Sequence, residues 1–220
     1  ATINLNSKIT SFELTNISFI NNTSNSLYGG GSSLIILGVQ GLIFNNCHFT
    51  NNCAYQDQSQ SRPTSSSEPY YNGDGGAIQI GYWCQTNNVD VSFTGCDFSG
   101  NKAERHGGAI SIQTLKTVNI NVCSFENNIA NGNFELTINI NMKEANFENH
   151  FHKKVDGRGG AIYINPSYSY SKDGLNCPTT TNTAMQSFTV STSTFSKNNA
   201  YDGYAMYIEG DESGTSFQIN

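Results

Sequence analysis

Residues 91–112 read VSFTGCDFSGNKAERHGGAISI, and this stretch contains the pattern that decides the fold. Counted from Phe98, apolar residues stand at positions −7 and −5, a cysteine at −2 and an asparagine at +3. A Gly-Gly-Ala sequence comes next, followed by isoleucines at the alternate positions Ile110 and Ile112. Alternation with a period of two is typical of β-strands whose two faces have different surroundings.

The same frame occurs six times, anchored on six phenylalanines: Phe19, Phe49, Phe98, Phe125, Phe147 and Phe195. The residues at −7 and −5 are apolar in every copy: Phe12 and Leu14, Leu42 and Phe44, Val91 and Phe93, Val118 and Ile120, Ile140 and Met142, Phe188 and Val190. The +3 residue is His150 in one copy and asparagine in the others: Asn22, Asn52, Asn101, Asn128 and Asn198. Such a repeat predicts a solenoid, because each unit buries its apolar face only against its neighbours.

The parity of the frame predicts the shape of each unit. Positions −7 and −5 alternate as in a strand, but positions −2 and 0 alternate in the opposite phase, so the chain must bend between them. A third strand follows most copies, at 75–80, 107–112, 159–164 and 203–208. Three short strands per coil predict an all-β, right-handed parallel β-helix, a pectin-lyase-like solenoid. About six full coils at about 4.8 Å each give a rod roughly 30 Å tall.

We expect a single β-helix domain over residues 1–220, interrupted by two surface loops at about 55–74 and 165–185. Both loops are rich in Ser, Thr, Pro and Tyr, which is typical of surface segments. A solenoid accommodates such insertions at its corners, because each coil contacts only its neighbours.

The two ends of the sequence resemble parts of coils. Ile3 and Leu5 match a third strand, and Phe217 and Ile219 match a first strand. Exposed strand edges favour pairing with another chain. The segment is therefore expected to belong to a longer protein, or to stack end to end with other copies and self-associate in isolation.

The repeated polar residues have a structural interpretation. Asparagine at +3 lies where the chain turns, and its amide can bond backbone groups of its own and adjacent coils. The sequence therefore predicts a structural ladder of asparagines: Asn22, Asn52, Asn101, Asn128 and Asn198. Alanine at +5 is expected to allow a tight corner.

The six cysteines fall into two groups. Cys47, Cys96 and Cys123 share the −2 position, so we expect a stack of small buried thiols. Parallel Cβ vectors fit disulfide geometry poorly, so these three are expected to be reduced. Cys84 and Cys177 both follow a third strand, and the second loop can reach back, which makes Cys84–Cys177 the expected disulfide.

Composition excludes several classes of function. Only 13% of residues are charged and the net charge is −6, so there is no basic stripe for nucleic acid. No apolar run has the length of a membrane-spanning helix. Three glycosylation sequons, at Asn16, Asn21 and Asn22, agree with export.

The paired motifs resemble the repeat of the chlamydial polymorphic outer membrane proteins. The F-x-x-N copies are FINN, FTNN, FSGN, FENN and FSKN, and the GGAI copies begin at Gly75, Gly107 and Gly159. The resemblance implies an exported β-helical passenger or ectodomain with an adhesive or structural role, and it supplies no catalytic residues. The chain departs from the pattern at His150, at Gly30 to Ser33, and at 134–136, where Phe-Glu-Leu replaces GGAI.

Many parallel β-helices are polysaccharide lyases or hydrolases, so an enzyme is the alternative to a scaffold. The residues just before the third strand form one polar row: Asp74, His106, Arg158 and Asp202. This row is either a catalytic or ion-binding site or a solvated turn of stacked unlike charges, and we favour the turn. His150 and His152 form an H-x-H sequence, but HFHKK is expected in an extended loop without a third ligand, so no metal site is assigned.

A second candidate surface is aromatic. It comprises six residues of the two loops and their flanks: Tyr70, Tyr71, Tyr82, Trp83, Tyr168 and Tyr170. Exposed tyrosines beside Ser and Asn are typical of adaptable binding surfaces, although tyrosine also merely covers sheet faces.

The sequence therefore predicts a non-enzymatic extracellular or cell-surface scaffold, adhesive or built into a filament or coat, with no cofactor. The expected partners are other copies or flanking coils of the same protein, together with surface glycans or proteins. The alternative is a carbohydrate-active β-helix enzyme, a polysaccharide lyase or hydrolase, or a glycan-binding module.

Overall fold

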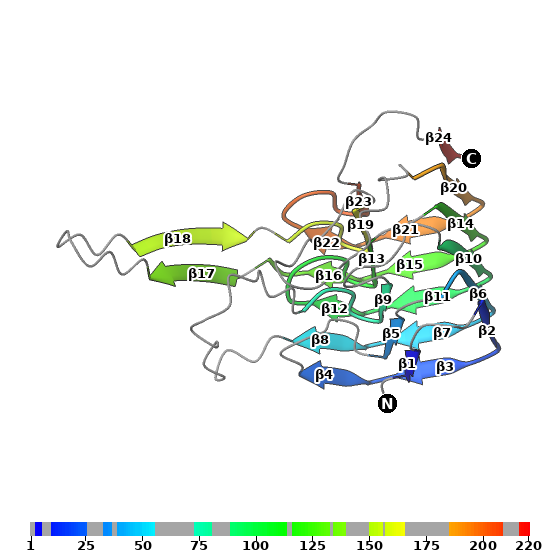
Figure 1. Ribbon diagram of the computed structural model, residues 1–220, viewed down its shortest axis with the longest axis horizontal. Coiled ribbons are helices and arrows are strands. Elements are labelled where there is room, and N and C mark those ends of the chain that lie inside the picture. The colour runs from blue at the N-terminus through cyan, green and yellow to red at the C-terminus, as the bar shows by residue number, and fades with distance from the viewer. Residues whose placement is uncertain are drawn as a thin grey trace.

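A computed structural model of the chain describes residues 3–5, 10–25, 33–36, 39–55, 73–80, 89–113, 116–132, 134–139, 150–155, 157–165, 185–208 and 216–220. In these ranges all regular secondary structure is β-strand. The strands form four parallel sheets and one antiparallel ribbon (Figure 1).

The parallel sheets are named A to D. Sheet A contains β1 (Ile3–Leu5), β5 (Leu34–Ile36), β9 (Ile78–Ile80), β13 (Ile110–Gln113), β19 (Ile162–Asn165) and β23 (Met206–Ile208). Sheet B contains β2 (Ser11–Thr15), β6 (Gly41–Asn45), β10 (Asp90–Thr94), β14 (Thr117–Asn121), β20 (Ser187–Ser191) and β24 (Ser216–Ile219). Sheet C contains β3 (Ser18–Ile20), β7 (His48–Thr50), β11 (Asp97–Ser99), β15 (Ser124–Glu126) and β21 (Thr194–Ser196). Sheet D contains β4 (Thr23–Asn25), β8 (Cys53–Tyr55), β12 (Lys102–Ala103), β16 (Ile129–Ala130) and β22 (Asn199–Ala200).

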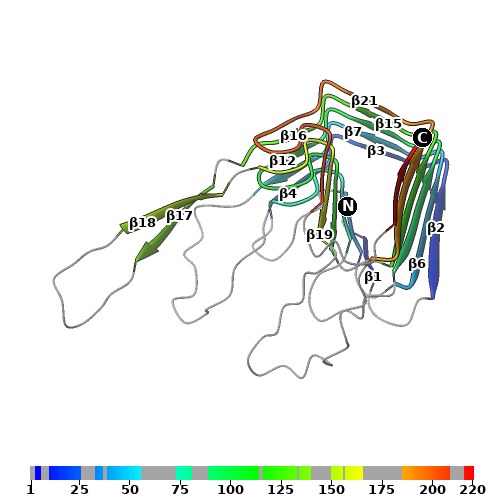
Figure 2. The same ribbon diagram turned by 90° about the horizontal axis from the view of Figure 1, so that it is seen from above.

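The chain passes through the sheets in the order B, C, D, A, and each passage makes one coil. Strands of the same sheet lie over one another when the stack is seen from above (Figure 2). The register is the one that the repeat predicts: Phe93 pairs with Phe44 and Ile120, and Phe98 pairs with Phe49 and Phe125. The predicted parallel β-helix is thereby confirmed.

The bend between sheets B and C is made by a single residue in the left-handed region. Gly95 occupies this corner with φ 63°, and Asn46 occupies the corresponding corner of the preceding coil with φ 51°. One such residue rotates the chain and inverts the inside–outside phase, which is the change of parity seen in the sequence. A second left-handed residue, Gly100 with φ 64°, makes the bend between sheets C and D.

The core is a column of stacked side chains. The phenylalanine rings of successive coils are nearly parallel, with centroids 4.8 Å apart for Phe49 and Phe98 and 4.7 Å apart for Phe98 and Phe125. Both contacts have the spacing of the strands themselves. The interior rings are fully buried, whereas Phe19 and Phe195 in the outer coils are partly buried.

Each coil has four strands where three were expected. The fourth strand, in sheet D, is two or three residues long and contains the +5 residue, which is Ser24 in the first coil and alanine in the other four. Ala54, Ala103 and Ala130 are buried in this sheet, and their Cα atoms pair between coils. These alanines are therefore core residues of a strand, and not only the small residues of a tight corner.

The coil that was expected around Phe147 is absent from the stack, so the prediction for that copy is wrong. Phe125 pairs directly with Phe195, which leaves five complete coils and not six. In place of a coil, β17 (Phe134–Asn139) pairs antiparallel with β18 (His150–Val155). A hairpin ribbon has the same period of two as a solenoid strand, so alternation alone did not distinguish them. Phe147 itself lies outside the described residues.

The ribbon extends away from the coil stack between β16 and β19 (Figures 1 and 2). It belongs to a third insertion, which the sequence analysis counted as part of the repeat. The two expected loops, about 55–74 and 165–185, lie mostly outside the described residues. The strands expected at Ile3–Leu5 and near Phe217 are present as β1 and β24.

Candidate functional site

Five asparagines form a continuous ladder at the corner between sheets C and D. The Oδ1 atom of Asn101 accepts hydrogen bonds from the Nδ2 and the backbone N–H of Asn52, at 2.9 and 3.1 Å. Asn128 accepts in the same way from Asn101, and Asn198 from Asn128. The ladder begins at Asn22, which donates to Asn52.

Each ladder amide after Asn22 is also bonded to the preceding coil. Asn101 Nδ2 donates to the carbonyl oxygen of Phe49 at 2.8 Å, so both of its hydrogens have acceptors. Asn52, Asn101 and Asn128 are fully buried. Buried amides that satisfy their hydrogen bonds internally stabilise a structure and offer nothing to a ligand. The ladder is therefore structural, as the sequence analysis assigned it.

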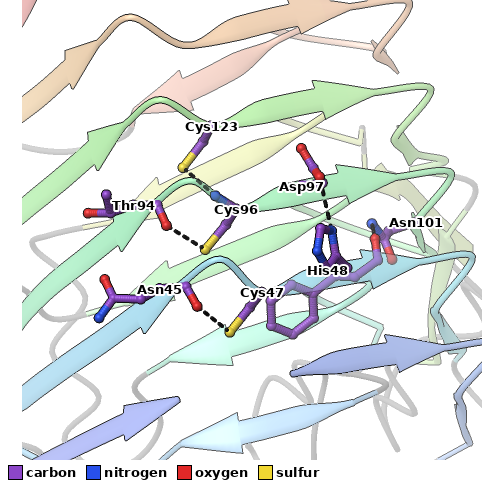
Figure 3. Close-up of polar contacts among 9 residues, drawn as sticks. Asn45, Cys47, His48, Thr94, Cys96, Asp97, Asn101 and Cys123 are labelled. Atoms are coloured by element: carbon purple, nitrogen blue, oxygen red, sulfur yellow. Dashed lines mark hydrogen bonds and ion pairs between the residues drawn. The ribbon is translucent and has the colours of Figure 1, made fainter. Parts of the chain in front are cut away.

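Three cysteines form a second ladder, at the corner between sheets B and C (Figure 3). Cys47, Cys96 and Cys123 are buried and unbridged. Cys47 Sγ donates to the carbonyl oxygen of Asn45 and Cys96 Sγ to that of Thr94, while Cys123 Sγ accepts from the backbone N–H of Cys96 at 3.4 Å. Burial raises the pKa of the Cys47 thiol. The hydrogen bond with Cys123 and burial together raise the pKa of the Cys96 thiol. The same hydrogen bond lowers the pKa of the Cys123 thiol, so the low reactivity of that residue rests on its burial. Enclosed thiols are poor nucleophiles and poor metal ligands.

The polar row stacks in successive coils as its spacing predicted. The backbone N–H groups of Gly75, Gly107 and Gly159 donate to the carbonyl oxygens of His106, Arg158 and Asp202. Gly107 has φ 66°, and a Cβ on Gly108 would clash with the carbonyl oxygen of Gly160, so the Gly-Gly pair permits the close approach of the coils.

The first member of the row, Asp74, is fully buried and already bonded. Its Oδ1 accepts from Arg105 Nε at 2.7 Å and from the backbone N–H of His106 at 3.1 Å, and its Oδ2 accepts from Arg105 Nη2. The sequence analysis missed Arg105. The available signal was its place beside His106, one coil beyond Asp74. An Arg–carboxylate pair that is bidentate and buried fixes geometry.

The other members of the row contact aromatic rings. The His106 imidazole stacks on the Tyr163 ring with centroids 4.5 Å apart. The Arg158 guanidinium lies 5.0 Å from the Tyr207 ring centroid, and its Nε is 3.9 Å from Asp202 Oδ2. Tyr163 and Tyr207 belong to the outer face of sheet A, so these contacts join the row to the sheet.

This arrangement lacks the geometry of a glycosidase pair. Asp74 and Asp202 stand three coil steps apart, which is about 14 Å along the stack. Glycosidase carboxylates lie about 5–10 Å apart. In the part of the chain that the structure describes, no group of three His, Cys, Asp or Glu residues could hold a metal ion.

An exposed ion pair that the sequence analysis did not mention joins sheet C strands of successive coils. His48 Nδ1 lies 2.9 Å from Asp97 Oδ2, and both side chains are about half exposed on the outer face of sheet C (Figure 3). The signal was available, because both residues occupy the −1 position of successive copies. Such an exposed pair contributes at most about 1 kcal/mol.

The sequons differ in accessibility. Asn16 and Asn21 are exposed at the two left-handed corners of the first coil. Asn22 donates its Nδ2 hydrogens to Asn52 Oδ1 and Ser33 Oγ, so a glycan on that nitrogen would disrupt the end of the ladder. Glycosylation remains a prediction, and Asn16 and Asn21 are its better candidates.

Two further sets of residues lie outside the described ranges. They are the expected disulfide pair Cys84 and Cys177, and the aromatic candidates Tyr70, Tyr71, Tyr82, Trp83, Tyr168 and Tyr170. Among the described residues there is no helix long and apolar enough to cross a membrane.

Comparison with known proteins supports the resemblance. The Chlamydia polymorphic membrane protein (Chlamydia_PMP) repeat matches residues 95–113 and 122–165. The first match runs from the Gly95 corner to the end of β13, and the second contains the β17–β18 ribbon and the next Gly-Gly-Ala strand. No curated protein and no solved structure matches the chain. The chain therefore contains two segments similar to the Chlamydia polymorphic membrane protein repeat, and both contribute strands to the parallel β-helix.

Proposed function

We propose that this chain is a non-enzymatic scaffold displayed outside the cell or at its surface, where it serves an adhesive or structural role. The observation that carries the proposal is the state of the polar row. Asp74, its most buried carboxylate, is bonded to Arg105 and to a backbone N–H, and the other carboxylate of the row, Asp202, stands three coil steps away. The matched repeat is named for a membrane protein, which supports display at a surface.

The outer face of sheet B is a suitable contact surface for such a scaffold. Its outward residues are mostly small and polar, such as Ser92, Thr94, Asn119 and Thr189. Hydroxyl and amide groups in a flat array offer donors and acceptors to glycans or to polar protein surfaces.

We also propose that further coils of the same kind, from this protein or another copy, pack against the stack. The interior phenylalanines are fully buried, whereas Phe12, Leu14 and Phe19 in one outer coil are only partly buried. Covering these side chains with another coil would bury more apolar surface and extend the asparagine ladder.

The proposal is tested first by location. Antibodies against the purified chain should label intact cells of the source organism without permeabilisation, and external protease should remove the signal. Labelling that needs permeabilisation would contradict display at the surface.

A second experiment separates a scaffold from an enzyme. The purified chain is incubated with pectin, alginate and host glycans, and the products are assayed for new reducing ends and unsaturated sugars. We expect none. Turnover that disappears in Asp202→Asn and persists in the outer-face variant Asn119→Ala would establish the enzymatic alternative instead.

A further inference from the structure

The second glycine of each Gly-Gly pair faces the next coil along the stack. A Cβ atom on Gly76 would clash with the carbonyl oxygen of Gly108, and a Cβ on Gly108 would clash with that of Gly160. These second glycines lack the left-handed φ of the first glycine in each pair, so they are needed for space and not for conformation. One added carbon at this position is therefore enough to keep the next coil from the strand spacing of about 4.8 Å.

Tyr204 occupies the position of the second glycine in the last coil. The backbone N–H of Gly160 donates to the carbonyl oxygen of Gly203, and a Cβ on Gly160 would clash with the carbonyl oxygen of Tyr204, which continues the series of the interior coils. Gly203 keeps the left-handed φ of a first glycine, at 63°. Ser32, which the strand register places at this position in the first coil, lies outside the described residues.

The side chain of Tyr204 points out of the end of the stack. Its backbone stands in the place where Gly76, Gly108 and Gly160 direct their missing Cβ atoms at the following coil. The residue is 69% exposed, which agrees with that direction. A tyrosine thus stands where each described interior coil has the one residue that lets another coil approach.

We propose that Tyr204 closes this end of the coil stack at the corner between sheets D and A, so that coils of the same geometry add only at the opposite end, beside β2 and β3. The inference rests on the proposal that further coils pack against the stack. Phe12 and Phe19 of the opposite end are only partly buried, which leaves apolar surface there for an added coil.

The closure is local to one corner. In sheet B, β24 continues the stack for one strand beyond β20 (Figure 1). A sixth coil can therefore begin in sheet B, but it cannot pass the corner occupied by Tyr204 in the geometry of the interior coils. Head-to-tail contacts between copies use two different ends and produce open filaments. A stack with one closed end does not grow in this way.

The experiment supplies the remaining strands of a sixth coil. Asn220 follows Ile219 in β24 and takes the register position of Thr94 in β10. A copy of residues 95–113 placed after Asn220 therefore continues the chain through the corners and strands of sheets C, D and A. The copied segment contains one lysine and one arginine, at which trypsin cleaves it when it is not packed.

The extension is added to the unaltered chain, to Tyr204→Gly and to Tyr204→Ala. Trypsin should cleave the extension at least about tenfold more slowly in Tyr204→Gly than in the unaltered chain, because only the unpacked fraction is cut. Tyr204→Ala is the matched control, since it removes the ring but keeps the Cβ atom, and its extension should be cleaved as fast as that of the unaltered chain. The extension should also raise the melting temperature of Tyr204→Gly and not those of the other two chains.

Thermal unfolding of the three chains without the extension shows whether the coil stack is intact in each. Equal protection of the extension in all three chains would overturn the proposal, and so would rapid cleavage in all three. Protection in Tyr204→Ala as strong as in Tyr204→Gly would contradict the clash of the Cβ atom on which the proposal depends. None of these results bears on display at the cell surface, which the labelling experiment tests separately.

Discussion

Asn101 accepts two hydrogen bonds from Asn52 through a single oxygen, at 2.9 Å from the side-chain nitrogen and 3.1 Å from the backbone nitrogen. It also donates to the carbonyl oxygen of Phe49, so one side chain connects to a neighbouring coil at three atoms. The ladder therefore bonds adjacent coils through side chains in addition to the strand hydrogen bonds.

Replacing Asn101 by leucine should lower the free energy of unfolding by about 1–3 kcal/mol. Leucine leaves the backbone N–H and Nδ2 of Asn52 without their acceptor in a buried place. Urea unfolding followed by circular dichroism measures the change. Asn119→Leu, on the exposed outer face of β14, is the control and should change stability little. Equal effects of the two substitutions would argue against the ladder.

Replacing Phe98 by alanine should cost about 3–5 kcal/mol, because it opens a cavity in the middle of the ring column. The matched substitution Phe19→Ala removes a ring that is only partly buried and should cost less. Chemical unfolding of both variants gives the comparison. A cost at Phe19 as large as that at Phe98 would contradict the difference in packing between outer and interior coils.

The cysteine ladder should resist modification in the folded chain. Cys47, Cys96 and Cys123 are enclosed, and the raised pKa of the Cys47 and Cys96 thiols leaves those two little thiolate. The hydrogen bond with Cys96 lowers the pKa of the Cys123 thiol, so Cys123 is protected by its burial alone. A bulky maleimide followed by peptide mapping should label Cys53, which is half-buried, before any of the three. Burial also raises the pKa of Cys53, so its labelling should accelerate as pH rises from 7 to 9. A cross-link between two ladder cysteines in the mapped peptides would disprove the packing.

Replacing Val122 by asparagine should stabilise the chain by about 1 kcal/mol. Val122 has φ 54° at the corner where Asn46 and Gly95 stand in the preceding coils, and a β-branched residue is strained in this region. The reverse change at the same corner, Asn46→Val, should destabilise by a similar amount. Thermal unfolding measures both. A lower melting temperature for Val122→Asn would show that the valine makes a compensating contact.

The sequence predicted the coils correctly where the side chains of one coil contact equivalent side chains in the neighbouring coils. The alternation around Phe98 and the asparagine at +3 are consequences of stacking. The same residue types therefore recur at the same position of each coil, and they indicate which residues pair between neighbouring coils. The prediction of a coil around Phe147 was wrong because a solenoid strand and a hairpin strand both alternate with a period of two residues. Its copy also lacked the asparagine that the ladder requires, and that departure was the better guide.

The side-chain contacts and short strands at the corners of the coils were less predictable. The repeat predicted that Asp74 and His106 align in successive coils. It did not predict the hydrogen bond from Arg105 to Asp74, because that contact depends on how far a side chain reaches between coils. The fourth strand was missed for another reason. It is only two or three residues long, and the periodicity of so short a segment is hardly distinguishable from that of a turn.

The direct pairing of Phe125 with Phe195 has a consequence for the order of assembly. Asn101 and Asn128 are 27 residues apart in the chain, whereas Asn128 and Asn198 are 70 apart. Closing the longer connection costs about 0.8 kcal/mol more in chain entropy, for the same contacts at the end. The coils around β10 and β14 should therefore form the folding nucleus, and β20 to β22 should dock on it afterwards. Amide hydrogens of β21 should accordingly exchange faster than those of β11, and the solenoid grows from its middle towards its C-terminal end.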